Sequence, residues 1–163
     1  MRFLVDGMLG GLTRWLRILG QRTEYDPWSE DEALLTKAEK ASMTLLTCDD
    51  ELCRRALRKN IRYLRVRGDS ETERLAHVSS ALGLALDINM DNALCPECGN
   101  YLHRATENGE LGELVPPNSL RVYNEFWVCD GADCQKVYWK GSHWKQIQST
   151  VHTAKILANA NSR

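Results

Sequence analysis

The 163-residue sequence has no long hydrophobic run and no excess of charge of either sign. Charged residues interrupt each apolar stretch well short of the roughly 18 residues that a membrane-spanning helix needs. Met1 and Arg2 lead to Asp6 without the apolar core of a signal peptide, so we expect a cytoplasmic protein without a membrane partner. With 43% hydrophobic and 26% charged residues, the composition excludes collagenous and broadly disordered chains and predicts a globular protein.

Charge is also balanced along the chain. Residues 1–90 carry 14 basic and 14 acidic side chains, and residues 91–163 carry 7 and 8, so neither part binds polyanions through bulk charge. Local density differs, because seven basic residues and no acidic residue lie between positions 54 and 67: Arg54, Arg55, Arg58, Lys59, Arg62, Arg65 and Arg67. This basic window can face phosphates, although a solvated helix and edge strand would have the same pattern.

Two common nucleotide-binding motifs are missing. The glycine segment at residues 7–11 lacks both the G-x-G-x-x-G spacing and the Gly-Lys-Ser/Thr ending of a phosphate loop. It instead permits a tight turn that leaves Asp6 accessible, beside the amino end of a helix whose dipole favours anions. On the polar side of that helix, Arg14 and Arg17 either extend a phosphate track or belong to an ordinary exposed face.

The spacing of apolar residues before position 90 alternates between strand and helix patterns. It predicts strands at 3–5, 23–25, 43–47 and 61–66, and helices at 8–19, 31–41, 51–59 and 70–82. This βαβαβαβα order predicts an α/β fold with an open parallel sheet and helices on both faces, because parallel strands need helical crossovers. We therefore expect one domain at 1–90 and a second at 91–163, the second ending in a helix.

Four of the six cysteines form two tight pairs, Cys95 with Cys98 and Cys129 with Cys134. Paired thiols at this spacing are metal ligands in a reducing compartment, and each pair directs two sulfurs at one point. Four thiolates complete a closed tetrahedral site, so the pattern predicts structural zinc in a small zinc ribbon. Two disulfides in a secreted protein are the alternative, which the missing signal peptide disfavours.

Acidic residues follow the predicted strands or open the predicted helices: Asp6, Asp31, Glu32, Asp49, Asp50 and Asp69. The carboxyl ends of parallel strands share one edge of the sheet, where ligands bind. Carboxylates gathered there need cations, and Mg²⁺ or Mn²⁺ prefers oxygen ligands and can activate water beside a phosphate. Asp31, Asp49 and Asp50 can alternatively cap helices, whereas Asp6 beside Gly7 offers a helix no such advantage.

The sequence resembles the PIN-like ribonuclease domain found at the C-terminus of the mutator exoribonuclease. The likeness covers about residues 2–144 and depends on the run from Phe3 through Asp6 to Gly20, on Asp31-Glu32, and on Leu45-Leu-Thr-x-Asp49. That family joins the domain to a zinc ribbon ending in Tyr-Trp-x-Gly-Ser-His, and Tyr138-Trp-Lys-Gly-Ser-His143 stands at that place. The resemblance implies a PIN-like fold with a zinc ribbon.

The same resemblance implies that Asp6, Asp31 and Asp49 gather Mg²⁺ or Mn²⁺ for phosphodiester hydrolysis, with Asp69 as a fourth acid and Glu32 as an alternative to Asp31. We therefore expect a divalent-metal-dependent ribonuclease acting on single-stranded RNA. The expected RNA contacts are Arg14, Arg17, Arg54, Arg55, Arg58, Tyr138, Trp139 and His143. The alternative is a non-catalytic RNA-binding or assembly module, in which the ribbon docks on RNA and the acids merely cap helices.

Overall fold

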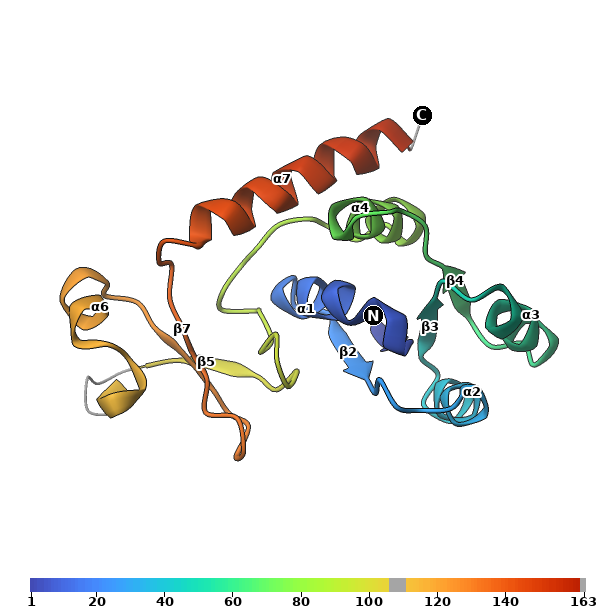
Figure 1. Cartoon of the computed structure of the whole chain (residues 1–163), viewed down its shortest axis with the longest axis horizontal. Coiled ribbons are helices and arrows are strands. Elements are labelled where there is room, and N and C mark those ends of the chain that lie inside the picture. The colour runs from blue at the N-terminus through green and yellow to red at the C-terminus, as the bar shows by residue number, and fades with distance from the viewer. Residues whose placement is uncertain (106–110, 162–163) are drawn as a thin grey trace.

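The computed structural model describes residues 1–105 and 111–161, and Figure 1 shows an α/β module followed by a smaller antiparallel sheet. The larger sheet contains four parallel strands: β1 (Arg2–Val5), β2 (Arg22–Tyr25), β3 (Thr44–Thr47) and β4 (Tyr63–Arg65). Their order is β2-β1-β3-β4, with Leu4 of β1 opposite Glu24 on one side and Leu45 on the other. The predicted open parallel sheet is confirmed.

Four helices cover the two faces of this sheet, as the alternation of its strands requires. They are α1 (Gly10–Ile18), which a 3₁₀ turn η1 (Gly7–Leu9) precedes, α2 (Asp31–Lys40), α3 (Asp50–Arg58) and α4 (Glu71–Leu82). Phe3 and Val5 are buried against α1 and α4, whereas Leu4 is buried against α2 and α3. Successive strand residues point to opposite faces, so each strand contributes to both cores.

A capping box starts α4. The Ser70 hydroxyl accepts a hydrogen bond from the Glu73 amide at 3.2 Å, and the Glu73 carboxylate accepts one from the Ser70 amide at 3.1 Å. Two backbone donors at the helix end are therefore satisfied by side chains. Gly83 ends the helix at φ 66°, a left-handed conformation that glycine adopts without a steric penalty.

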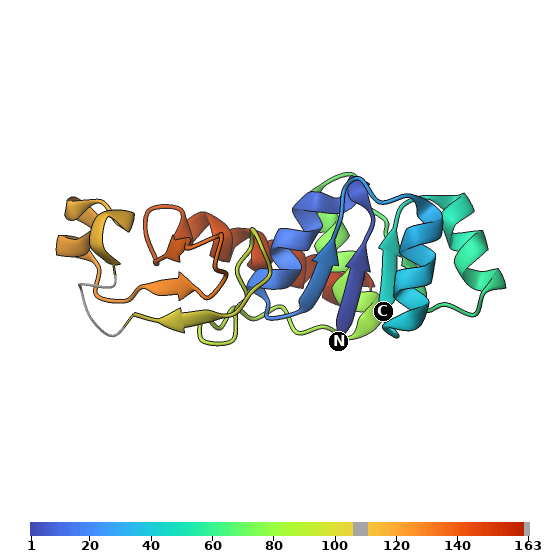
Figure 2. The same ribbon diagram turned by 90° about the horizontal axis from the view of Figure 1, so that it is seen from below.

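The second sheet is antiparallel and contains β5 (Leu102–Arg104), β6 (Trp127–Cys129) and β7 (Val137–Tyr138). A 3₁₀ turn η2 (Gly112–Leu114) and a short helix α6 (Pro117–Val122) lie between β5 and β6. This ribbon has a small core of its own: Leu111, Val115, Phe126 and Val128. In Figure 2 the ribbon extends from one end of the α/β module, which gives the molecule an elongated outline.

The chain ends in the long helix α7 (Trp144–Asn161), which confirms the packing helix expected after the ribbon. Figure 1 shows α7 lying along α4, and Val151, Ala154 and Ala158 are buried in the same core as Phe3 and Val5. The last helix of residues 91–163 thus shares the core of residues 1–90. Within residues 1–105 and 111–161, no helix combines the length and the hydropathy needed to cross a membrane.

Candidate functional site

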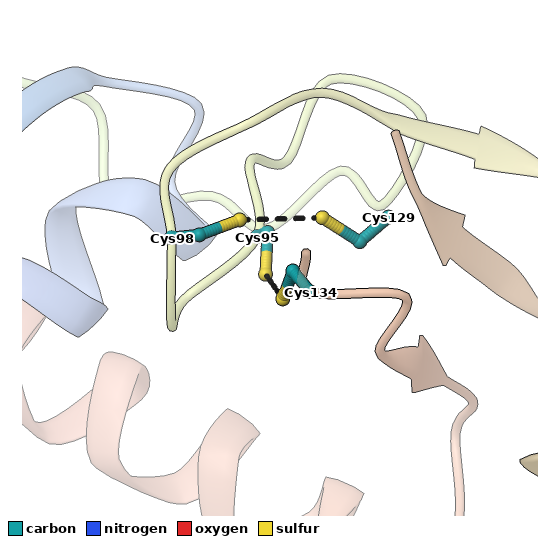
Figure 3. Close-up of side chains that lie close together, drawn as sticks. All are labelled: Cys95, Cys98, Cys129 and Cys134. Carbon is teal, nitrogen blue, oxygen red and sulfur yellow. Dashed lines mark hydrogen bonds between the residues drawn. The ribbon is translucent and has the colours of Figure 1, made fainter. Parts of the chain in front are cut away.

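The two cysteine pairs meet in the ribbon. The Sγ atoms of Cys95, Cys98, Cys129 and Cys134 all lie within 4.8 Å of one another, and Figure 3 shows them as one cluster in which Cys98 faces Cys129 and Cys95 lies beside Cys134. Cys95 is 3.7 Å from Cys134, and Cys98 is 3.3 Å from Cys129. Sulfurs bound to a tetrahedral zinc at about 2.3 Å would be about 3.8 Å apart, so this cluster could bind zinc.

Hydrogen bonds prepare one of these sulfurs for metal binding. Burial opposes ionisation of Cys98, but hydrogen bonds from the Asn100 backbone and side chain and from Cys129 and Cys95 together outweigh it and lower the pKa of Cys98 to about 6. The side-chain Nδ2 atom of Asn100 lies 3.3 Å from this sulfur. Burial raises the pKa of Cys129, although the Gly131 amide donates to its sulfur at 3.3 Å. Because thiolates are the ligand form, binding of zinc would displace the remaining thiol protons.

Arg17 connects the cysteine cluster to the α/β module. Its side chain is buried, and it donates to the backbone oxygens of Pro96 at 3.0 Å, Glu97 at 2.8 Å and Thr23 at 3.1 Å. Gly99 allows this approach, because a Cβ there would lie 3.0 Å from the guanidinium. Arg17 is therefore almost fully covered, with 6% of its surface open to solvent, and its contact with RNA stays a prediction. The pattern of α1 could not reveal this, because the covering loop lies about 80 residues away in sequence.

We expect Arg17→Met to destabilise the protein by about 2–4 kcal/mol, because it leaves buried backbone oxygens without donors. Arg14→Met is the matched control on the same helix. Arg14 is exposed, and its 3.4 Å ion pair with Glu97 is worth at most about 1 kcal/mol. Urea denaturation followed by circular dichroism measures both variants. Equal stability of the two variants would show that the Arg17 contacts contribute little.

Asp6 and Asp49 lie together at the carboxyl edge of the sheet. Asp6 follows β1 and Asp49 follows β3, and the chain leaves these neighbouring strands toward opposite faces. The Thr47 hydroxyl joins the two acids, because it donates to Asp6 Oδ2 at 2.7 Å and accepts from the Asp49 amide at 3.0 Å. In open parallel sheets this point of divergence is where ligands bind.

The two acids differ in how their carboxylates are engaged. The Asp6 side chain caps no helix, even though the η1 turn begins directly after it. The Asp49 Oδ1 atom accepts from the amides of Glu51 at 2.6 Å and Leu52 at 2.9 Å, so Asp49 is the N-cap of α3. Among the described residues, Asp6 Oδ1 and Asp49 Oδ2 accept no hydrogen bond. Both acids therefore keep one oxygen available to a ligand.

The structure does not bring the other two predicted acids into contact with Asp6. Asp31 lies at the start of α2 and forms a 3.0 Å ion pair with Arg55, which also binds Glu32 at 2.6 Å. Neither Asp31 nor Glu32 caps α2, because no side chain accepts a hydrogen bond at the N-cap of this helix. The carboxylate of Asp69 has no hydrogen-bond or ion-pair partner among residues 1–105 and 111–161. In the same residues, no three carboxylates converge as closely as the cysteine sulfurs do.

Glu71 is an acid that the sequence analysis did not select. Its Oε1 atom pairs with Arg74 at 2.8 Å, while its buried Oε2 atom has no partner in the described part of the chain. Gly11 at the start of α1 makes room for it, because a Cβ there would lie 2.6 Å from the carboxyl group. Burial raises the pKa of Cys48, and the negative charges of Asp6 and Glu71 add to this effect. The carboxylates of Glu71 and Asp6 therefore both influence the Cys48 thiol.

The family model for the Mut7-C RNAse domain matches residues 1–151 of this chain. The chain belongs to the Mut7-C RNAse domain family. Its function is therefore ribonuclease-related, and the resemblance identified from the sequence is confirmed. No curated protein and no solved structure matched the chain. The Mut7-C match extends over the α/β module, the ribbon and the first part of α7, so these parts belong to one family unit.

The basic window of this Mut7-C chain is largely neutralised by acids that lie outside it in sequence. The ion pairs join Arg54 and Arg58 to Glu51, Arg55 to Asp31 and Glu32, Lys59 to Glu32, and Arg65 to Asp50. Arg62 and Arg67 form no ion pair with the described residues. The surface around α3 is therefore a network of exposed ion pairs rather than a uniformly positive face.

The final motif of the Mut7-C ribbon serves the ribbon core in part. Tyr138 is half-buried, and its hydroxyl lies 3.1 Å from the Cys95 sulfur. The Trp139 ring packs against Phe126, with ring centroids 5.9 Å apart. His143 is exposed beyond β7. Of the three predicted RNA-binding residues of this motif, His143 is thus the one that solvent reaches most freely.

Proposed function

We propose that this Mut7-C protein is a divalent-metal-dependent ribonuclease that hydrolyses phosphodiester bonds of single-stranded RNA at the carboxyl edge of its parallel sheet. The observation that carries this proposal is the Asp6 carboxylate, which ends β1 beside Asp49 and caps no helix. The Thr47 hydroxyl satisfies one oxygen of this partly buried acid and leaves the other open, which supports a role for Asp6 as a cation ligand.

The donor atoms at this edge fit Mg²⁺ or Mn²⁺. These ions prefer oxygen ligands, keep several waters, and often bind through one or two carboxylates together with substrate phosphates. The open oxygens of Asp6 and Asp49 would be such ligands. The buried Oε2 atom of Glu71, which has no partner among the described residues, would add a further carboxylate charge, although these three acids do not converge as closely as the cysteine sulfurs do. A bound cation would supply a Lewis acid that activates water and offsets phosphate charge.

The chain's own side chains orient the reactants in this proposal. The Thr47 hydroxyl holds one oxygen of Asp6 and leaves the other turned to the ligand. Arg74, which pairs with Glu71, and Arg65 both act electrostatically on Cys48 beside Asp6, so positive charge lies close to the edge. These guanidinium groups would attract the RNA phosphate without neutralising Asp6 directly.

Single-stranded RNA is the proposed substrate because its bases are open to stacking and its backbone can follow an exposed edge. Arg14 is exposed, the arginines of α3 are exposed or half-buried, and their ion pairs are weak enough for phosphates to replace the acids. Those arginines are Arg54, Arg55 and Arg58. Tyr138, Trp139 and His143 of the ribbon complete the proposed RNA surface, with His143 the most accessible.

We assign structural zinc to Cys95, Cys98, Cys129 and Cys134. Four cysteine ligands leave no open position for a reacting water, so this site stabilises the ribbon rather than taking part in hydrolysis.

A second function, a non-catalytic RNA-binding or assembly module, is favoured by one observation. Asp49 caps α3 and Asp31 pairs with Arg55, so both acids already have structural partners. Asp6 caps no helix and keeps one oxygen open, and Glu71 keeps a buried oxygen without a described partner beside its ion pair with Arg74, which makes hydrolysis the better proposal.

Cleavage of end-labelled RNA tests the proposal. Zinc-loaded protein is incubated with single-stranded RNA, duplex RNA and single-stranded DNA, each with and without Mn²⁺ or Mg²⁺. We expect cleavage of single-stranded RNA that depends on the added cation. Binding of RNA without cleavage under either cation would instead support the non-catalytic module.

The fourth acid can be identified by comparing Glu71→Gln with Asp69→Asn. We expect Glu71→Gln to weaken Mn²⁺ binding by about 10- to 100-fold, because it removes a buried carboxylate charge beside the ion. Asp69→Asn is expected to leave the affinity unchanged. Electron paramagnetic resonance of free Mn²⁺ measures both constants without RNA. The reverse ranking would restore Asp69 as the fourth acid.

A further inference from the structure

Trp28 is the most exposed large hydrophobic residue in the described part of the chain, with 91% of its surface open to solvent. It lies in the loop between β2 and α2 and contributes nothing to either core of the α/β module. A single exposed apolar residue is ordinary on a protein surface. Trp28 differs from such a residue because its loop lies against the segment that follows Asp6.

The loop that carries Trp28 is pressed against the segment that directly follows Asp6. A Cβ at Gly7 would lie 2.9 Å from the Pro27 backbone oxygen, so only glycine allows this approach. The Tyr25 hydroxyl donates to the Gly7 backbone oxygen at 3.0 Å and ties the end of β2 to the same segment. Asp6 and Trp28 each directly adjoin a residue of this Gly7–Pro27 contact.

The backbone of the loop is ordered by its own short-range contacts. The Trp28 amide donates to Asp26 Oδ1 at 3.1 Å, and the Ser29 amide donates to the Asp26 backbone oxygen at 3.3 Å. Pro27 fixes one further backbone torsion between them. A side chain presented on such a turn loses little conformational entropy when it binds a flat ligand.

Charge indicates which part of a nucleotide this loop suits. Asp26 and Glu30 flank Trp28 and are both exposed, so the loop repels phosphates. An indole ring offers a flat face that attracts any nucleobase, and stacking requires the base to be unpaired. The loop is therefore suited to hold a base while the backbone turns away toward Asp6.

We propose that Trp28 is a base-stacking site for an unpaired nucleotide of the RNA whose phosphate lies at the Asp6 edge. This site rests on the proposed function for its substrate, and it explains how that edge selects single strands. A duplex keeps its bases stacked on each other, so it cannot use the indole. Stacking is tolerant of sequence, so the site favours no particular base.

The test measures binding in an Asp6→Asn background, so that cleavage does not interfere. Affinities for fluorescein-labelled single-stranded RNA are determined by anisotropy for the parent, Trp28→Ala, Trp28→Phe and the control Leu57→Ala. Leu57 is a comparably isolated apolar side chain, 62% exposed on α3. We expect Trp28→Ala to weaken binding by about 5- to 150-fold, which one stacked base provides, while Trp28→Phe and Leu57→Ala bind nearly as the parent does.

Two further measurements separate stacking from a general loss of binding. Affinity for duplex RNA is expected to be equal in the parent and Trp28→Ala, and the salt dependence of single-strand binding is expected to keep its slope, because indole carries no charge. Unchanged single-strand affinity in Trp28→Ala would overturn the proposal, as would an equal loss for duplex.

Cleavage by proteins that retain Asp6 is assayed separately. If RNA is cut but Trp28→Ala binds like the parent, the stacking site fails and the nuclease stands. If Trp28→Ala loses single-strand affinity but no protein cuts RNA, the stacking site stands and the nuclease fails.

Discussion

Replacement of Asp6 by asparagine is expected to lower the rate of RNA cleavage by at least about 100-fold. The variant loses one carboxylate charge at the proposed cation site, and electrostatic stabilisation by such an ion is worth several kcal/mol in the transition state. Asparagine keeps an oxygen that can accept the hydrogen bond from Thr47, which lies 2.7 Å from the acid. The fold is therefore expected to persist, and single-turnover cleavage of labelled RNA measures the loss.

Asp87→Asn is the matched control for this experiment. Asp87 also carries a carboxylate, but its contact is an exposed 2.9 Å ion pair with Lys155 on α7, remote from the sheet edge. We expect its cleavage rate to stay within about twofold of the parent, in keeping with the small energies of exposed ion pairs. Equal rates in Asp6→Asn and the parent would contradict the assignment of Asp6.

Loss of the zinc site is expected to unfold the ribbon while the α/β module remains folded. The apolar core of the ribbon contains few side chains, and a unit of this size rarely folds without a metal or disulfides. Zinc bound by four cysteines contributes about 10–16 kcal/mol in small domains, more than such a core supplies. Cys98→Ser removes the sulfur whose lowered pKa, about 6, favours binding.

Hydrogen exchange with mass spectrometry measures this result segment by segment. In Cys98→Ser we expect β5, β6 and β7 to lose protection, while β1 and β3 keep it. Cys53→Ala is the control, because Cys53 lies buried on α3 outside the cysteine cluster. The Cys53→Ala protein is expected to keep one zinc ion per chain. Protected ribbon amides in Cys98→Ser would show that the ribbon folds by its apolar core alone.

Periodicity was sufficient to predict the architecture of the α/β module. Strand residues such as Phe3, Leu4 and Val5 face two cores in turn, and helices of ten or so residues separate them, so a parallel sheet with helices on both faces follows from local pattern. The cysteine spacing likewise predicted the cluster. The short elements between β5 and β6 were not predicted, because their few apolar residues have no clear period.

The candidate site was harder to predict, because side-chain partners distant in sequence decide it. The window around α3 contains no acid of its own, yet acids from α2 and from the start of α3 pair with its arginines. Arg17 lies on the polar side of its helix, where an exposed residue is expected, but the loop of the first cysteine pair covers it. Nothing in the sequence distinguishes Glu71 from an ordinary first-turn acid, because its buried oxygen without a partner among the described residues depends on the space left by Gly11.

The packing of α7 on α4 makes the ribbon an insertion rather than an appendage. Both of its ends return to the same α/β module, and Arg17 adds a third attachment beside the first cysteine pair. A unit anchored in this way has little freedom to swing, so the span between His143 and the Asp6 edge is set by the architecture. An RNA strand that contacted both would therefore have to span a fixed distance between them.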